Sequence, residues 1–145
     1  MTISVIGLNH KSANIDIREK FSFTADSASL LLRRIKKFRD IQEVIVVSTC
    51  NRTEIYCESA NGSDDIKNWL LSEKEYKSFA KHLYVHQEED AIEHLFKVVA
   101  GLDSMVIGES EVLGQVKTAY KIALDNKSID GKLKRLFEYS FSVAK

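Results

Sequence analysis

Proline is absent from this 145-residue sequence, and cysteine occurs only twice. Two cysteines cannot form the multi-disulfide framework that stabilises small secreted domains, so we expect both thiols to be reduced. No apolar run approaches the roughly 20 residues of a transmembrane helix, and the first residues lack the basic segment and cleavage site of a secretory signal. We therefore expect a cytoplasmic protein that makes no membrane contact.

Glycine is also scarce, and its spacing is informative. None of the six glycines forms a Gly-x-Gly pair with another, so the sequence lacks both the dinucleotide-binding fingerprint and the phosphate-binding loop. The sequence has no excess of positive or negative charge, because 21 basic residues balance 21 acidic ones. A net charge of zero argues against nucleic-acid binding over the whole surface but leaves a local basic patch open.

The sequence does contain enough apolar residues for one core. At 44% hydrophobic, its 145 residues fit a single domain, 1–145. Segments of β-branched or alternating residues predict strands, and apolar residues at helical spacing predict helices. In chain order we expect strand 3–8, helix 26–38, strand 43–50, strand 53–59, helix 66–76 and a short edge strand 83–85. This order is typical of an α+β, ferredoxin-like split βαβ sandwich.

The remaining residues are predicted to be helical. Acidic residues at 88–90 favour a helix start, Ser110 is a candidate cap for a second helix, and a third helix begins after Gly131. The last apolar stripe still runs at Lys145 without a glycine or polar stop. We therefore expect a helical segment that ends in the start of a long linking helix, and a chain that is one piece of a longer protein.

Cys50 is the first candidate for chemistry. It follows a buried apolar strand in the segment STCNRTE, 48–54, where a tight polar turn can present a side chain at the rim of a sheet. Arg52 would favour the thiolate, which is the nucleophilic form. The alternative is a buried small hydrophobe, since free cysteine is among the most buried residue types. Cys57 lies inside the next strand, and there we expect the structural role.

Metal binding is the rival hypothesis for Cys50, Cys57, His10 and His94. The two cysteines are separated by six residues, and the histidines are far away in the sequence. This spacing matches no short-range zinc pattern. We therefore expect no metal site.

Three sequence blocks together resemble a known family. GLNHKSA near the start, STCNRTEIY in the middle and HLFKVVAGLDSMVIGESEVLGQVK further on resemble, in this order, the glutamyl-tRNA reductases. The resemblance implies that this chain is the N-terminal catalytic, glutamyl-tRNA-binding domain, and that NADPH-binding and dimerisation domains lie outside it. Asn14 and Ser110 stand where the family usually has proline, which affects local rigidity rather than the chemistry.

The resemblance also implies a reaction. A thiolate displaces the ribose oxygen of glutamyl-tRNA and forms a glutamyl thioester, which accepts hydride better than an ester does because sulfur donates less electron density to the carbonyl. NADPH then reduces the thioester to glutamate-1-semialdehyde, in the first step of C5-pathway tetrapyrrole (porphyrin and haem) synthesis. The implied partners are glutamyl-tRNA, a second copy in a homodimer of the full-length protein, and the semialdehyde aminomutase that receives the product.

The matched blocks imply roles for individual residues. Cys50 matches the nucleophile, and His94 matches an active-site histidine that polarises the carbonyl or moves a proton to the leaving ribose oxygen; a satisfied core histidine is the structural alternative. A guanidinium binds a carboxylate with two prongs, so Arg52 is the candidate for holding the substrate side chain. The other substrate-binding candidates are Thr49, Ser104, Asn9, His10, Glu109 and Gln115.

A dense basic cluster on the predicted helix 26–38 keeps a second hypothesis open. Such a cluster is either the solvated face of an amphipathic helix or a contact for the tRNA backbone. A non-catalytic ferredoxin-like module that binds RNA or a regulatory protein is therefore the alternative to the enzyme, and it requires Cys50 to be buried and dispensable. The members of the cluster are Arg33, Arg34, Lys36, Lys37 and Arg39.

Overall fold

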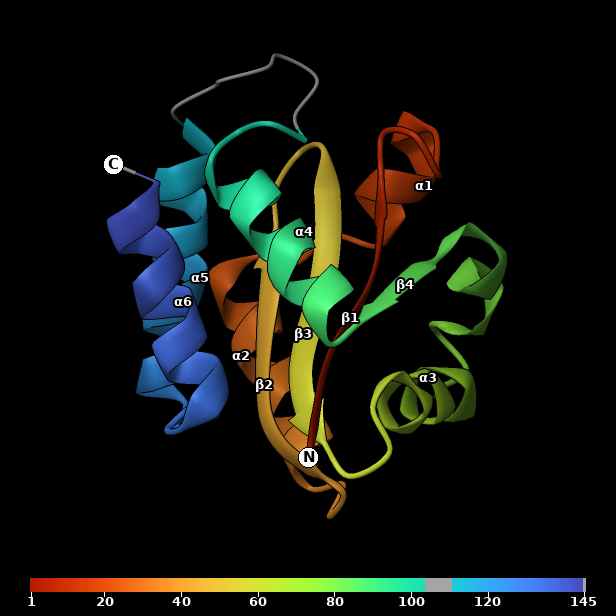
Figure 1. The fold of residues 1–145 in the computed structure, drawn as a ribbon. Helices are drawn as coiled ribbons and strands as arrows, with labels where there is room; N and C mark the ends of the chain where they lie inside the picture. The colour runs from red at the N-terminus through yellow and green to blue at the C-terminus, as the bar shows by residue number, and fades with distance from the viewer. Residues whose placement is uncertain (104–110, 145) are drawn as a thin grey trace.

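The computed structural model describes residues 1–103 and 111–144. Its centre is a four-stranded antiparallel sheet in the order β2-β3-β1-β4 (Figure 1). One helical segment separates β1 from β2 and another separates β3 from β4, so the predicted ferredoxin-like split βαβ arrangement is confirmed. The strands are β1 (Thr2–Asn9), β2 (Ile41–Ser48), β3 (Arg52–Ser59) and β4 (Tyr84–Gln87).

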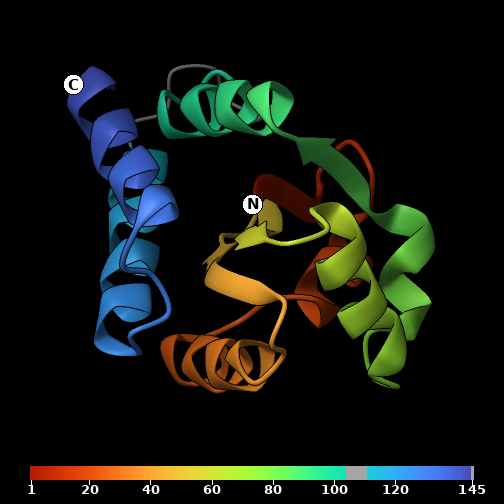
Figure 2. The same ribbon diagram turned by 60° about the horizontal axis from the view of Figure 1, so that its bottom comes forward.

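Helices cover both faces of the sheet and the β2 edge (Figure 2). Two of them, α2 (Ala25–Lys36) and α3 (Ser63–Ser72), lie on one face, and α4 (Glu89–Val99) crosses the other. Along β2 runs α5 (Glu111–Asp125), and α6 (Lys132–Val143) packs beside α4 and α5. Two short elements are α1 (Ile15–Lys20) and the 3-10 helix η1 (Lys77–His82). No helix in the described ranges is long and apolar enough to cross a membrane.

Two features near the site differ from the sequence prediction. The short helix α1 was not predicted. The side-chain oxygen of Asn14, the residue before the helix, accepts the backbone N–H of Ile17 at 3.0 Å and caps α1 at a position where the resembled family usually has proline. Strand β2 ends at Ser48 rather than at Cys50, because the N–H of Thr49 donates to the carbonyl of Arg52 at 2.8 Å and closes a tight turn. Cys50 therefore lies in this turn.

Side-chain alternation in β3 places charged residues on the face that α4 covers. Tyr56 packs edge-on against Phe137 of α6, with ring centroids 5.2 Å apart, and Glu54 contacts His94 of α4. Because alternate residues of a strand share a face, Arg52 lies on this side too, and the intervening residues face α2 and α3. This face of the sheet thus carries ionised groups inside the protein.

Gly7 in the middle of β1 makes room on the same face. In the strand register, Gly7 lies opposite both Glu54 of β3 and Tyr84 of β4. A Cβ atom at Gly7 would lie 2.8 Å from Cγ of Glu54 and 2.6 Å from the carbonyl oxygen of Thr53, which is closer than real Cβ contacts. The missing side chain therefore lets the Tyr84 hydroxyl reach across β1 to Glu54.

Glu43 of β2 ties the sheet to the start of α6. Its buried carboxylate accepts four backbone N–H groups from residues at or just before this helix start, at 2.8 to 3.3 Å. The first N–H groups of a helix have no intrahelical partner, so the carboxylate satisfies them and complements the helix dipole. Burial alone would raise the pKa of Glu43, but the hydrogen bonds from Gly131, Leu133, Asp130 and Lys134 lower it overall.

We predict that Glu43→Gln lowers the free energy of unfolding at pH 7 by about 1–3 kcal/mol, because an amide cannot accept all of these N–H groups as a carboxylate does. Folding lowers the pKa of Glu43, so its stabilising contribution is present above the ordinary carboxyl pKa of about 4.3 and is lost as the pH falls through the folded value. The difference between the two proteins in urea unfolding should therefore shrink below about pH 4.

Glu58→Gln is the matched control for this experiment. Glu58 lies opposite Glu43 on the neighbouring strand, and its pKa is raised by burial and by the Glu43 charge. One of its carboxylate oxygens is buried without a hydrogen-bond partner among the described residues. Removing this charge should leave the stability at pH 7 unchanged or raise it. Equal losses in the two variants would show that capping of α6 by Glu43 does not stabilise the fold.

Candidate active site

The carboxylate of Glu54 is the centre of a buried polar cluster, and 0% of this residue is exposed. One carboxylate oxygen accepts the hydroxyl of Tyr56 at 2.7 Å. The other contacts Nη1 of Arg52 at 3.2 Å, the hydroxyl of Tyr84 and Nε2 of His94. A carboxylate can be enclosed in this way only when several donors replace its lost hydration.

The strand register and one helix bring these donors together. Arg52 and Tyr56 share a face with Glu54 because each is two residues away along β3, and Tyr84 lies in the same row of the sheet across β1. His94 reaches Glu54 from α4, and its side chain is 11% exposed. The cluster therefore forms only when β1, β3, β4 and α4 are all in place.

Arg52 joins Glu54 to a second carboxylate. Its side chain is 2% exposed, and Nη2 donates to Oδ2 of Asp103 at 2.9 Å and to the backbone carbonyl of Asp103. The Asp103 side chain is 21% exposed and also lies 3.7 Å from the ammonium group of Lys11. Of the two carboxylates that contact Arg52, Glu54 is thus the enclosed one and Asp103 the accessible one.

The pKa shifts in the cluster follow from this pairing. Burial alone would raise the pKa of Glu54, but His94 and Arg52 hold it well below its usual range. Burial would likewise raise the pKa of Asp103, but the hydrogen bond and the charge of Arg52 lower it. Burial and the Glu54 charge raise the pKa of Tyr84 far above its usual value. At neutral pH both carboxylates are therefore ionised, and Tyr84 is a hydroxyl donor.

A cavity of about 470 Å³ opens beside this cluster. Its walls include Asn9, Tyr84, His86, His94 and Asp103, together with three charged residues of α4. The rings of His86 and His94 lie against each other, with centroids 4.6 Å apart and planes inclined by 31°. Burial and the neighbouring His94 lower the pKa of His86. The cavity thus combines aromatic rings with charged and polar groups, as sites for polar organic ligands do.

Cys50 lies at a second cavity, of about 370 Å³. Its side chain is exposed, so the buried alternative is wrong for Cys50, whereas Cys57 is buried as predicted. Arg18 of α1 secures the turn that carries the thiol, because its Nε donates to the carbonyl of Cys50 at 3.3 Å and its Nη1 to the carbonyl of Ala13 at 2.9 Å. The thiol is therefore accessible, and its backbone is tied to two other segments.

The segment from Cys50 to Arg52 connects the two cavities. Cys50 lines the second cavity, and Arg52, two residues later, contacts Asp103 in the wall of the first. His94 lines the first cavity. Among the described residues, the link between Cys50 and His94 runs through Arg52 and Glu54.

The other predicted site residues are distributed between these two places. Thr49 and Gln115 line the Cys50 cavity. Asn9 lines the His94 cavity, and its side-chain oxygen also accepts the N–H groups of the next turn, at 2.9 and 3.2 Å. Ser104 and Glu109 lie outside the described residues.

His10 occupies the turn after β1 and is not among the residues that line either cavity. Burial, together with the charges of Arg52 and Lys11, lowers its pKa. Its Nδ1 is buried without a hydrogen-bond partner among the described residues. His10 therefore lies near the cluster, and its assignment to substrate binding stays a prediction.

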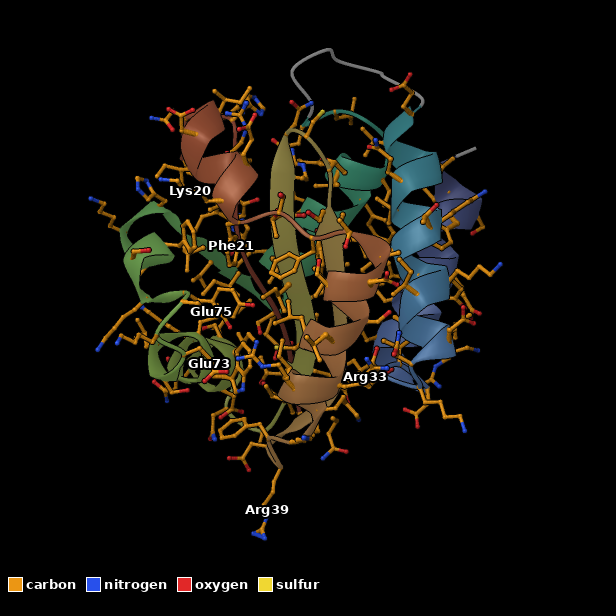
Figure 3. All side chains as sticks on the ribbon, turned by 180° about the vertical axis from the view of Figure 1, so that it is seen from behind. Lys20, Phe21, Arg33, Arg39, Glu73 and Glu75 are labelled. Carbon is orange, nitrogen blue, oxygen red and sulfur yellow. The ribbon has the colours of Figure 1, made fainter. Side chains whose placement is uncertain are left out.

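The predicted basic cluster separates into two parts on folding. Arg34 turns onto the segment after α3, where it pairs with Glu73 and, at 2.8 Å, with Glu75. Arg33 and Arg39 remain exposed, and Arg39 extends away from the body of the protein (Figure 3). The two neighbouring lysines of the cluster are exposed as well. Four of the five basic residues thus remain accessible to a partner.

Glu54, Tyr84 and Asp103 are members of the cluster that the sequence analysis did not identify. One signal was present for Glu54: Arg52, Glu54 and Tyr56 alternate in a strand with apolar neighbours, a pattern that marks a polar strand face. Tyr84 and Asp103 reach the cluster through strand register and helix packing, which no local pattern predicts.

Comparison with known proteins agrees with the sequence blocks. The family described as "Glutamyl-tRNAGlu reductase, N-terminal domain" matches residues 6–145. Proteins named glutamyl-tRNA reductase from Idiomarina loihiensis and Xylella fastidiosa (strain M23) are each 43% identical to this chain, and one from Aliivibrio fischeri (strain ATCC 700601 / ES114) is 42% identical. The alignments cover 100% of this chain but only 35%, 33% and 36% of these relatives. The chain thus spans about a third of their length.

A solved structure of glutamyl-tRNA reductase from Methanopyrus kandleri has a similar fold. The TM-score is 0.78 at 27% sequence identity, and the match covers 98% of this chain and 33% of that one. The family match over residues 6–145 and the structural match each cover nearly the whole chain. The chain therefore belongs to the glutamyl-tRNA reductase N-terminal domain family.

Proposed function

We propose that this chain performs the acyl-transfer half of the reaction for which its relatives are named, by binding glutamyl-tRNA and moving the glutamyl group onto Cys50. The observation that carries this proposal is the exposed Cys50 thiol on a tight turn, two residues before the buried guanidinium of Arg52. Family membership supports it, since relatives aligned with the whole chain are named glutamyl-tRNA reductase.

In the proposed step, Sγ of Cys50 attacks the carbonyl carbon of the ester that joins glutamate to the terminal ribose of the tRNA. A carbon–sulfur bond forms, the bond from this carbon to the ribose oxygen breaks, and the thiol proton ends on that oxygen. The products are a glutamyl thioester on Cys50 and free tRNA. Thr49 and Gln115 share the cavity with Cys50 and are the proposed contacts for the bound ester.

Arg52 is proposed to bind the γ-carboxylate of the glutamyl group by exchanging it for Asp103. The guanidinium already contacts two carboxylates, and both would repel a third anion. Glu54 is enclosed, whereas Asp103 is partly exposed at a cavity wall. If the γ-carboxylate replaces the Asp103 carboxylate, Arg52 still contacts two negative charges and its pair with Glu54 stays intact. The planar guanidinium also matches the geometry of a carboxylate.

His94 is proposed to move a proton to the leaving ribose oxygen. It lines the cavity beside Asp103, whereas Cys50 lines the other cavity. A substrate that meets both residues must therefore extend from one cavity into the other. Proton transfer by a positioned histidine is an ordinary contribution to such a step.

The described residues do not fit NADPH, the reductant that the resemblance implies. A dinucleotide fingerprint requires a glycine-rich turn between a strand and a helix of a parallel βαβ unit, and the strand pairs of this sheet are antiparallel. Nor does the described part of the chain place three or more His, Cys, Asp or Glu side chains around a metal position. We therefore assign the hydride step to no residue of this chain.

Family membership supports three broader proposals. They are dimerisation, handover of the semialdehyde to an aminomutase, and a place in cytoplasmic tetrapyrrole synthesis. The exposed basic residues of α2 keep a binding module as the competing function, and the two functions differ in what they require of Cys50.

Alkylation with iodoacetamide at neutral pH should distinguish the two thiols. Cys50 is exposed, whereas Cys57 is fully buried and burial raises its pKa. Because the thiolate is the reacting form, we expect Cys50 to be labelled at least about tenfold faster, as read by peptide mass spectrometry. Equally slow labelling of both cysteines would contradict the proposed nucleophile and favour the binding module.

Incubation with glutamyl-tRNA should place a glutamyl group on Cys50, and Cys50→Ser should reduce this adduct by at least about 100-fold. A serine hydroxyl has a far higher pKa than the cysteine value of about 8.5, so without a dedicated base it stays protonated and weakly nucleophilic. Intact-mass spectrometry measures the adduct, and filter binding measures tRNA affinity, which should be nearly unchanged.

Cys57→Ser is the control for this substitution, since its side chain is buried away from the turn and should leave acylation intact. Failure of the wild-type protein to form the adduct would refute the proposed function. Parallel loss of tRNA binding in Cys50→Ser would mean that the substitution had damaged the fold.

Arg52→Lys should slow acylation from glutamyl-tRNA by more than about tenfold although the charge is kept, because a lysine cannot bind a carboxylate with two prongs. The loss should be smaller for glutaminyl-tRNA, whose side chain carries no charge. The variant also weakens the pairing with Glu54, and comparing two substrates on one protein preparation cancels that effect on stability. Equal losses for both substrates would remove Arg52 from recognition of the γ-carboxylate.

A further inference from the structure

The exposed basic residues at the end of α2 have no part in the chemistry proposed so far. Residues 33–39 contain five basic residues and no acidic one, in a chain whose basic and acidic residues are equal in number. We propose that this region binds the RNA backbone of the substrate, where the base-paired stem begins. A groove between α2 and α5 then carries the single-stranded 3′ end of the tRNA to Cys50. The inference rests on the proposed function of Cys50, but a binding measurement decides it without the acylation step.

Folding neutralises one member of the cluster and leaves the others available. Arg34 pairs with Glu73 and Glu75, and among the described residues no other member of the cluster forms an ion pair. Lys36 donates to the backbone carbonyl of Gln42 at 2.6 Å, a contact that leaves its charge without a counter-ion. The cluster therefore keeps four positive charges at the surface.

Lys127 adds a fifth positive charge to this surface from the end of α5. The preceding residue, Asn126, donates from its side-chain amide to the hydroxyl of Ser29 of α2 at 2.9 Å, so the two helices meet here. Lys127 is exposed. We refer to the exposed cations at this place as the basic patch, and its members are Arg33, Lys36, Lys37, Arg39 and Lys127.

Stability of the helix explains only part of the basic patch. Basic residues in the last turn of a helix complement its dipole, which accounts for Arg33 and Lys36. Lys37 and Arg39 come after the last residue of α2, and Arg39 extends away from the body of the protein (Figure 3). Arg33 and Lys37 are also like charges four residues apart, which repel each other. A polyanion bound at this surface would remove that repulsion.

The cavity that holds Cys50 continues along α2. A smaller cavity of about 130 Å³ adjoins it and shares Phe23, Ser48 and Gln115 with it. Residues of α2 and α5 form the walls of the smaller cavity, and Ala25 of the first turn of α2 is one of them. Open space therefore leads from the thiol to the side of α2 that faces α5. This space is the groove of the proposal.

The basic patch lies on the groove side of α2. Ala25, Ser29 and Arg33 follow one another at intervals of four residues and so share one stripe of the helix. Ala25 lines the groove, and Ser29 contacts Asn126 at the end of α5. Arg33 comes next on this stripe, at the α5 side of α2 (Figure 3). The patch is thus at the opposite end of α2 from Cys50.

The dimensions suit the 3′ end of a tRNA, which is a short single strand that continues from a base-paired stem. The 12 residues of α2 span about 18 Å. At about 3.4 Å or more per nucleotide, this distance corresponds to a few nucleotides of single strand. Phe23 is half-buried in the groove wall and offers a ring on which a base can stack. Phosphates of the stem would then meet the basic patch.

A triple substitution removes charge from the patch without disturbing the contacts of α2. Arg33→Gln/Lys37→Gln/Arg39→Gln keeps long polar side chains and leaves Lys36, which contacts the backbone, in place. The matched control removes the same charge from α3 and η1, on the side of the protein away from α5 (Figure 2). Its substitutions are Lys67→Gln, Lys77→Gln and Lys81→Gln, all at exposed positions.

Filter binding of tRNA measures the effect. Each lost phosphate contact lowers the slope of log affinity against log salt concentration by about 1. We expect the triple variant to bind tRNA at least about tenfold more weakly at about 0.1 M salt, with a slope smaller by about 2 to 3, and the control to stay within about twofold of the wild-type affinity. Equal losses in the two variants, or wild-type affinity and slope in the triple variant, would overturn the proposal.

An oligonucleotide with the sequence of the tRNA 3′ end separates the groove from the patch. It is long enough for the groove but lacks the stem. The wild-type protein should bind the whole tRNA more tightly than this oligonucleotide, and the triple variant should lose most of that difference. A difference that the triple variant retains in full would show that the stem is bound elsewhere.

Lysine acetylation of the wild-type protein tests the same surface without any substitution. Bound tRNA should protect Lys37 and Lys127 severalfold, as read by peptide mass spectrometry, and should leave Lys67 and Lys77 unprotected. Absence of protection at both Lys37 and Lys127 would overturn the proposal, even if the triple variant does not fold. The same samples, prepared with glutamyl-tRNA, report the thioester on Cys50. If no thioester forms, the proposed function fails, and the protection pattern still decides where the RNA binds.

Discussion

The carboxylate of Glu54 is removed from water completely, and the site is arranged around that constraint. An unpaired buried carboxylate costs several kcal/mol, so each of its donors has to be held in place by the fold. Arg52 and Tyr56 come from the same strand, Tyr84 from a strand two positions away in the sheet, and His94 from the helix above. Docking of α4 on the sheet therefore completes the polar cluster by adding His94.

Accessible and enclosed groups are separated in this fold. Cys50 lies in an exposed turn held by Arg18, whereas Arg52, two residues later, is almost fully buried between two carboxylates. A reactive thiol must meet a large substrate, and a recognition group gains most from a dry and rigid setting, because electrostatic interactions are stronger there. The tight turn after β2 thus places an exposed thiol and a buried guanidinium within three residues of each other.

The sequence predicts the strands, the five helices from α2 to α6 and the ferredoxin-like order, because alternation and helical spacing are local signals. It also predicts that Cys50 is the thiol to examine, from its place after an apolar strand. The contact between Glu54 and Tyr84 depends on strand register across Gly7 and joins residues 30 positions apart. The six-residue α1 is too short for a periodic pattern. Asp103 follows α4, and its contact with Arg52 depends on how that helix docks on the sheet.

Because α4 follows all four strands in the chain, it is synthesised after the sheet that it covers. All four strands, with α2 and α3, lie within residues 2–87, so every residue of the sheet is added to the chain before His94. A sheet that forms before α4 docks presents Glu54, Arg52 and Tyr56 to water on one face. Charged groups on an open sheet face favour hydration over contact with other unfinished chains, and exposed apolar surface is what makes folding intermediates aggregate. The polar cluster thus reduces the apolar surface that this face exposes until α4 and α6 cover it.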